Sequence, residues 1–127
     1  MTYIDTNILV RIITGDDPAL ADRGFKLLAN LGKKSVKISE GVLTELCFVL
    51  EFHDYRMQRG DICQALRTIF GFSQIVHDEI TERVIDHFEQ HSELDFVDCL
   101  LLERARQDEV ITFDKSLQKA IHDTKQK

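Results

Sequence analysis

The sequence lacks any run of about 20 apolar residues, the length that a helix needs to cross a membrane. Residues 1–5 enter a strand-like pattern directly, without a basic or apolar signal region. We therefore expect a cytoplasmic protein with no membrane partner. Internal repeats, low-complexity tracts and linkers are also missing, so the 127 residues are expected to form one domain, 1–127.

Cysteine and proline are scarce. The three cysteines Cys47, Cys63 and Cys99 lie in apolar helical patterns, and no pair has the short spacing of a zinc site. Buried thiols in a reducing compartment are therefore expected. The single proline, Pro18, follows a turn sequence and predicts the first position of a helix.

Positive charge is also in short supply, because 16 Lys and Arg face 22 Asp and Glu and leave a net charge of −6. Phosphate binding needs positive charge, so this balance at first argues against a nucleic-acid partner. However, five acids that could share one site account for all but one of the six excess negative charges, and a bound metal ion would offset them. An RNA substrate is therefore not excluded. The five acids are Asp5, Glu45, Asp95, Asp98 and Asp114.

Short apolar segments alternate with longer amphipathic ones along the chain. The short segments predict strands over 2–5, 36–39, 73–77 and 110–113. The segments between them predict helices, the first capped by Thr6 and the second beginning at Pro18. Further helices are expected after Ser39 and over 61–70, 78–91 and 95–106, with a last one after Asp114. This alternation indicates an α/β domain with a parallel sheet.

Four of the acids are placed where such a sheet binds ligands, outside the carboxyl ends of its strands. Asp5 and Asp114 each end a predicted strand, Glu45 follows one by about two helical turns, and Asp98 begins a helix. We expect the four carboxylates to converge on one edge of the sheet. Carboxylates suit hard cations such as Mg²⁺ and Mn²⁺, which can activate water and orient a phosphodiester.

Each acid also has a purely structural interpretation. Asp95 and Asp98 have the spacing of a helix capping box, and Asp114 could cap the last helix. Glu45 could be a partly solvated helix residue. Because all the acids would have to be structural at once, the metal site is the preferred interpretation.

Together, these motifs resemble the PIN-domain ribonucleases, and within them the small VapC-type toxins of bacterial toxin–antitoxin pairs. The resemblance extends over nearly the whole chain. The residues that carry it are Tyr3–Val10, Leu43–Leu46, Asp95–Leu101 and Thr112–Lys115.

The resemblance implies a PIN-like three-layer α/β/α domain with a short, mainly parallel sheet of four to five strands. It also implies an endoribonuclease that depends on Mg²⁺ or Mn²⁺ and cleaves single-stranded or structured RNA. Three of the matching acids would be metal ligands, and the fourth would hold or deprotonate the attacking water. The metal ligands are Asp5, Asp98 and Asp114, and the fourth acid is Glu45.

Supporting hydrogen-bond roles are implied for Asn7, Asp95 and Thr112. Their alternatives are turn geometry for Asn7, helix capping for Asp95 and strand-end packing for Thr112. The implied partners are an RNA such as tRNA or rRNA, a cognate antitoxin and a second copy in a homodimer. The alternative functions are a non-catalytic PIN-like module that binds RNA or protein, and a phosphoryl-transfer α/β domain.

Two helical segments carry further candidate residues. His87 and His91 are four residues apart but lack the His-Glu-x-x-His pattern, so we expect a solvated helix face and not a zinc site. The segment 46–52 is apolar on more than one face. Most of it should be core, and an exposed remainder could form a homodimer interface or a groove for an antitoxin helix.

Overall fold

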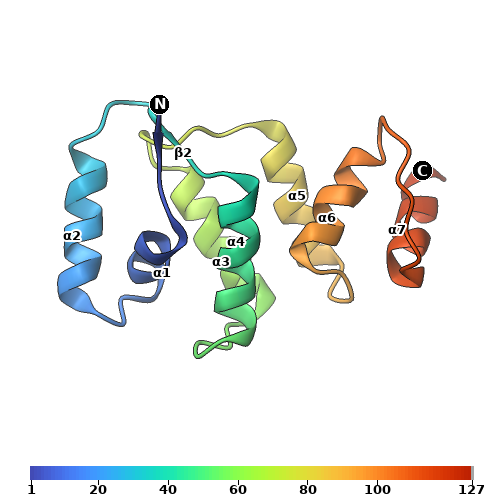
Figure 1. Cartoon of the computed structure of the whole chain (residues 1–127), viewed down its shortest axis with the longest axis horizontal. Helices are drawn as coiled ribbons and strands as arrows, with labels where there is room; N and C mark the ends of the chain where they lie inside the picture. Colours follow the sequence, from blue (N-terminus) through green and yellow to red (C-terminus); the bar gives the residue numbers. More distant parts are fainter. Residues whose placement is uncertain (127) are drawn as a thin grey trace. The chain divides into compact units, whose positions relative to one another are not determined.

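The computed structural model describes residues 1–126, which form two compact units divided between His77 and Asp78. The expectation of one domain stays a prediction. The first unit contains two short strands and four helices (Figure 1). Their bounds are β1 (Thr2–Tyr3), α1 (Thr6–Thr14), α2 (Pro18–Ala29), β2 (Val36–Lys37), α3 (Glu40–Phe52) and α4 (Arg59–Phe70).

The sheet of the first unit is short and parallel. β1 pairs with β2 in the register Thr2 with Val36 and Tyr3 with Lys37. An isolated parallel bridge joins Val36 to Ile75, where residues 73–77 were expected to form a third strand. The α/β class and the short parallel sheet are thus confirmed. Of the four to five expected strands, the described residues show two paired strands and this bridge.

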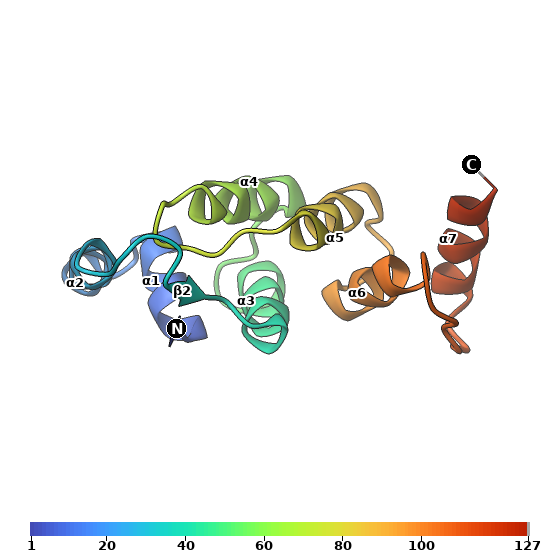
Figure 2. The same ribbon diagram turned by 90° about the horizontal axis from the view of Figure 1, so that it is seen from above.

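Helices supply most of the core of the first unit. α1 packs against α2 and α3, and α3 packs against α4 (Figure 2). A glycine lets α1 and α2 approach closely, because a Cβ atom at Gly24 would lie 3.1 Å from Cγ1 of Ile12. Gly15 ends α1 with a left-handed φ of 62°, which glycine adopts without strain.

The second unit consists of three helices, α5 (Glu79–Gln90), α6 (Phe96–Arg104) and α7 (Lys115–Lys125), and α6 packs against both α5 and α7. The rings of Phe88 and Phe96 meet edge to face with centroids 5.5 Å apart. Both side chains are buried, and burial of side chains of this size contributes roughly 2 kcal/mol each.

Side-chain caps explain where most helices begin. The prediction that Thr6 caps α1 is wrong, because Thr6 is the first helical residue and is buried. Asp5 is the cap, and its Oδ1 accepts a hydrogen bond from the backbone N–H of Ile8. The other side-chain caps are Asp17, Ser39, Asp78, Asp95 and Asp114.

The prediction of a strand over 110–113 is also wrong. This segment is irregular, and it makes no backbone–backbone hydrogen bond to any other residue of 1–126. Ile111 and Phe113 are 90% and 101% exposed. A four-residue apolar run predicts a strand only where a partner strand accepts its hydrogen bonds, and none pairs with it among the described residues.

Two predictions from composition can be compared with the fold. Cys47, Cys63 and Cys99 are buried thiols, as expected. Within residues 1–126, no helix has both the length and the apolar character needed to cross a membrane.

Candidate functional site

Asp5 follows β1 and begins α1. The N–H of Ile4 donates to the carbonyl of Lys37 at 3.4 Å, which extends the sheet pairing up to this residue. Oδ1 of Asp5 accepts from the N–H of Ile8 at 3.2 Å. The other carboxylate oxygen makes no hydrogen bond or ion pair among residues 1–126 and belongs to an exposed side chain.

Glu45 is exposed on α3. Ser39 sets the start of this helix, because its Oγ accepts from the N–H of Val42 at 3.2 Å. Within the described part of the chain, Glu45 makes no hydrogen bond or ion pair. Its carboxylate is therefore available to an external group.

Asp95 and Asp98 form the capping box that their spacing indicates. Oδ1 of Asp95 accepts from the N–H of Asp98 at 2.8 Å, and Oδ2 of Asp98 accepts from the N–H of Asp95 at 3.2 Å. Burial raises the pKa of Asp98, and the negative charges of Asp95 and Asp114 raise it further. The backbone hydrogen bond from Asp95 opposes this rise without cancelling it. A cation beside Asp98 would relieve the repulsion.

Asp114 begins α7 and is held from both sides. Its Oδ1 accepts from the N–H of Leu117 at 2.8 Å. Its own N–H donates to Oγ1 of Thr112 at 3.0 Å. Gln118 in turn donates from Nε2 to the carbonyl of Thr112 at 2.7 Å. These contacts fix the backbone that carries Asp114.

The five acids differ little in burial: Asp98 is partly buried and the others are exposed. Each aspartate uses one oxygen at a helix N-terminus, and the second oxygens of Asp5 and Asp114 have no partner among residues 1–126. Such oxygen donors fit a hard divalent cation.

The acids are divided between the two units. Asp5 and Glu45 belong to the first unit, and Asp95, Asp98 and Asp114 belong to the second. Across residues 1–126, no three His, Cys, Asp or Glu side chains are gathered so that they could hold a metal ion. Convergence of the four acids therefore stays a prediction.

A cavity of about 200 Å³ opens between α1 and α2 beside Asn7. Arg11 and Arg23 contribute to its lining together with apolar side chains. Nε of Arg11 is buried without a hydrogen-bond partner among the described residues. The complete lining is Asn7, Ile8, Arg11, Leu20, Arg23, Gly24 and Leu27.

Sequence reasoning missed a polar network around Asp16, in the turn between α1 and α2. The hydroxyl of Tyr55 donates to Oδ2 of Asp16 at 2.6 Å, and Nη1 of Arg11 donates to the same oxygen at 2.8 Å. The hydroxyl of Thr14 donates to Oδ1 at 2.9 Å. Led by the bond from Tyr55, these contacts lower the pKa of Asp16 to about 2. Because Tyr55 is 39 residues away, no local signal could reveal the contact.

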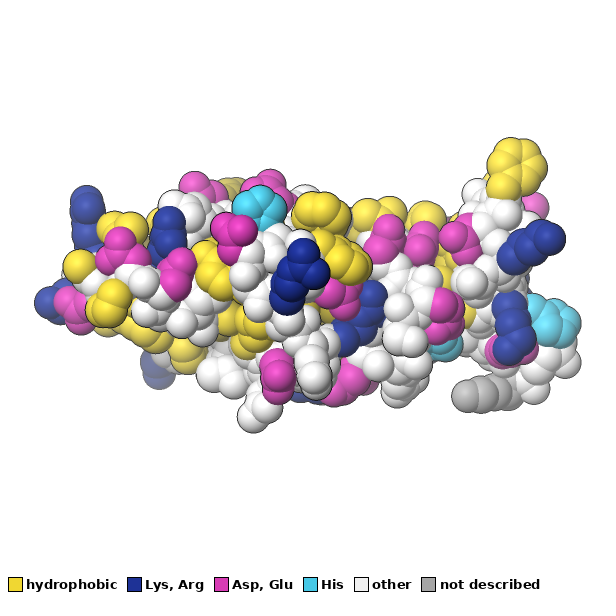
Figure 3. Space-filling model, turned by 90° about the horizontal axis from the view of Figure 1, so that it is seen from below, with side chains coloured by type: hydrophobic (Ala, Val, Ile, Leu, Met, Phe, Trp, Pro, Cys, Tyr) yellow, Lys and Arg dark blue, Asp and Glu magenta, His cyan; other side chains and the backbone are white. Residues whose placement is uncertain are grey.

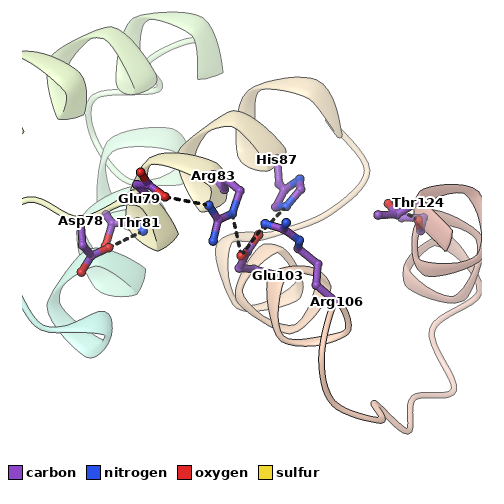
Figure 4. A network of polar contacts seen from close by, with 9 residues as sticks. Asp78, Glu79, Thr81, Arg83, His87, Glu103, Arg106 and Thr124 are labelled. Atoms are coloured by element: carbon purple, nitrogen blue, oxygen red, sulfur yellow. Dashed lines mark hydrogen bonds and ion pairs between the residues drawn. The ribbon is translucent and has the colours of Figure 1, made fainter. Parts of the chain in front are cut away.

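A second missed network surrounds Glu103 on α6 (Figure 4). Its carboxylate accepts from Nε of Arg83 at 2.8 Å and lies 3.2 Å from Nε2 of His87. Arg106 donates from Nη1 at 3.3 Å. The interpretation of His87 and His91 as a solvated face is therefore wrong for His87, which faces a buried carboxylate. His91 contacts a separate acid through Nδ1.

Comparison with protein families shows that residues 2–122 match the PIN domain. The chain belongs to the PIN domain family. Comparisons with curated proteins and with solved structures found no match. PIN domains are generally nucleases and typically use divalent metals, so membership indicates nuclease activity. It also accounts for a helix-rich α/β domain with a short parallel sheet.

Proposed function

We propose that this PIN domain is a metal-dependent endoribonuclease whose acidic quartet is Asp5, Glu45, Asp98 and Asp114. The supporting observation is that three of these side chains keep carboxylate oxygens without a hydrogen-bond or ion-pair partner among the described residues. Each of the three aspartates uses one oxygen at a helix N-terminus, and Asp5 and Asp114 keep the other without a partner among residues 1–126. Glu45 has both oxygens available within the same range.

In this proposal, Asp5, Asp98 and Asp114 hold Mg²⁺ or Mn²⁺. The ion, when bound, lowers the pKa of water and polarises the phosphodiester. Glu45 orients the attacking water and accepts its proton. The water oxygen bonds to phosphorus while the bond from phosphorus to the 3′ oxygen breaks. That oxygen takes a proton from solvent, and the products carry a 5′-phosphate and a 3′-hydroxyl.

Three further residues would position the quartet. Thr112 accepts from the N–H of Asp114, and Asp95 accepts from the N–H of Asp98, so both restrain a proposed ligand. Asn7 follows Asp5 by two residues and borders the cavity between α1 and α2, and its side-chain amide would supply a supporting hydrogen bond beside Asp5.

We also propose that the protein is a VapC-type toxin that acts on tRNA or rRNA in the cytoplasm, as a homodimer controlled by a cognate antitoxin. The four matching motifs support this assignment. Exposed apolar side chains on α2 are available for protein contacts, among them Leu20 at 38% and Leu27 at 54%.

The test is cleavage of total RNA by purified protein, free of any bound partner, with Mg²⁺, with Mn²⁺ or with EDTA. We expect cleavage with either metal, loss of cleavage in EDTA, and fragments that map to discrete 5′-phosphate ends. Folded protein that cleaves equally well in EDTA would contradict the metal-dependent mechanism. Folded protein that never cleaves but binds RNA would indicate a non-catalytic binding module.

A further inference from the structure

α3 carries an aromatic pair on its solvent side. Its core side chains are buried, and Glu45, Phe48 and Phe52 follow one another at helical spacing on the exposed side. Phe48 and Phe52 are 59% and 58% exposed. Their rings contact each other with centroids 5.6 Å apart and planes inclined at 51°. The core side chains are Leu43, Leu46, Cys47 and Leu50.

The size of this pair argues for a small, flat ligand. A phenylalanine buries roughly 150–250 Å² when it is covered completely, so two rings more than half exposed offer about 200–300 Å². A stable protein interface takes about 800 Å² from each partner. The other large exposed apolar side chains of residues 1–77 lie on β1 and α2 or at the N-terminus: Met1, Tyr3, Leu20, Phe25 and Leu27.

The distribution of charge argues for contacts that do not depend on phosphate. Residues 1–77 contain nine basic and nine acidic side chains, and residues 78–127 contain seven and thirteen. Acidic and basic side chains are interspersed on the face drawn in Figure 3. RNA affinity through phosphate contacts requires an excess of positive charge, which neither part of the sequence has. Stacking of bases on aromatic rings supplies affinity without such an excess.

We propose that Phe48 and Phe52 form a stacking platform for unpaired bases of the RNA substrate. The platform lies next to the phosphate that is attacked by the water that Glu45 orients. This inference rests on the proposed function. Along the helix axis, the two residues lie roughly 4.5 Å and 10.5 Å beyond Glu45, on the same side. The platform therefore receives the one or two bases adjacent to the cleaved bond. Because only unpaired bases expose a face, it favours loops and single strands over duplex.

The test measures RNA binding separately from cleavage. An Asp5→Asn background prevents turnover, and a fluorescent single-stranded RNA is titrated with this protein and with its Phe48→Ala/Phe52→Ala derivative. The same RNA is also used with one abasic position, which is moved along the sequence. We expect the double substitution to weaken binding of intact RNA about 10-fold. At one or two positions of the RNA, the abasic site should weaken binding to the Asp5→Asn protein by a similar factor. The same abasic RNA should bind the Phe48→Ala/Phe52→Ala derivative as tightly as intact RNA does.

Two controls separate stacking from other effects. Phe25→Ala removes a half-exposed ring from α2 and should leave RNA affinity unchanged. Phe48→Leu/Phe52→Leu keeps an apolar helix surface without flat rings, and should bind as weakly as the alanine derivative. Light scattering reports the oligomeric state of every variant.

Equal loss of affinity for intact and abasic RNA would overturn the platform, and so would an Asp5→Asn protein that fails to bind RNA. Dissociation of a dimer in both double variants would identify the aromatic pair as a protein interface instead. The wild-type protein could fail to cleave RNA while the abasic site still weakens binding to the Asp5→Asn protein and not to the Phe48→Ala/Phe52→Ala derivative. That result would support the platform and contradict the nuclease proposal.

Discussion

Replacing Asp5 with asparagine is expected to lower the rate of RNA cleavage by at least about 10³-fold while the fold stays intact. Asparagine caps a helix about as well as aspartate does, so the hydrogen bond from the N–H of Ile8 can persist. Only the negative charge and one oxygen donor to the metal are lost. The measurement is single-turnover cleavage at saturating Mg²⁺, with circular dichroism to verify the fold.

Asp17 provides a matched control, because it caps α2 through the same geometry. Oδ1 of Asp17 accepts from the N–H of Leu20 at 3.2 Å, the distance found between Asp5 and Ile8. Asp17→Asn should therefore cleave RNA at the wild-type rate. If both variants kept full activity, or both lost it equally, Asp5 would have no specific role in catalysis.

The largest expected effect on stability comes from Glu103→Gln. Glu103 is 8% exposed and is held by Arg83, His87 and Arg106. Removing the carboxylate charge leaves these groups without their common partner. We expect the free energy of unfolding at pH 7 to fall by about 2 kcal/mol. Urea unfolding followed by circular dichroism measures this change.

The loss of stability caused by Glu103→Gln should become smaller as the pH falls. Burial alone would raise the pKa of Glu103, but hydrogen bonds from Arg83 and His87 and the charges of Arg83 and Arg106 bring it below the ordinary value of 4.5. The folded state therefore binds this proton less readily than the unfolded state does. The stabilisation is complete above pH 4.5 and is lost as the pH falls through the lowered pKa.

The difference in stability between the wild type and Glu103→Gln should accordingly shrink below pH 4.5. Glu79→Gln is the comparison variant. The side chain of Glu79 is 91% exposed, and its Oε2 lies 3.8 Å from Nη1 of Arg83, a long distance for an ion pair. Its effect should stay within about 0.5 kcal/mol. A gap between wild type and Glu103→Gln that is constant or grows towards acid pH would contradict this account.

Most helix starts could be predicted from the sequence because capping is local. Asp95 and Asp98 are three residues apart, and Pro18 follows a turn, so nearby residues alone determine the geometry. Asp5 and not Thr6 caps α1, an error of one residue that reflects how alike these side chains are as caps.

Contacts between distant residues could not be predicted in the same way. Glu103 meets Arg83 across 20 positions, and Tyr55 meets Asp16 across 39. The apolar run at 110–113 has the composition of a strand, but a strand also needs a partner, which composition does not reveal.

The site itself stays a prediction. The order and types of its four acids could be recognised because they lie in four short motifs that resemble those of the PIN-domain ribonucleases. Their local contacts are now defined: the aspartates lie at helix N-termini, and Asp5 and Asp114 each keep an oxygen that has no partner within residues 1–126. Whether the acids converge depends on contacts between distant parts of the chain, which neither composition nor capping determines.

The most direct test of the central claim is a Mn²⁺ titration by electron paramagnetic resonance on the wild type, on Asp5→Asn, on Asp98→Asn and on the double variant. If both carboxylates bind one ion, each single substitution should weaken the same site by at least about 10-fold, and the two effects should not add in the double variant. Wild-type Mn²⁺ affinity in either single variant would show that Asp5 and Asp98 do not share a metal site.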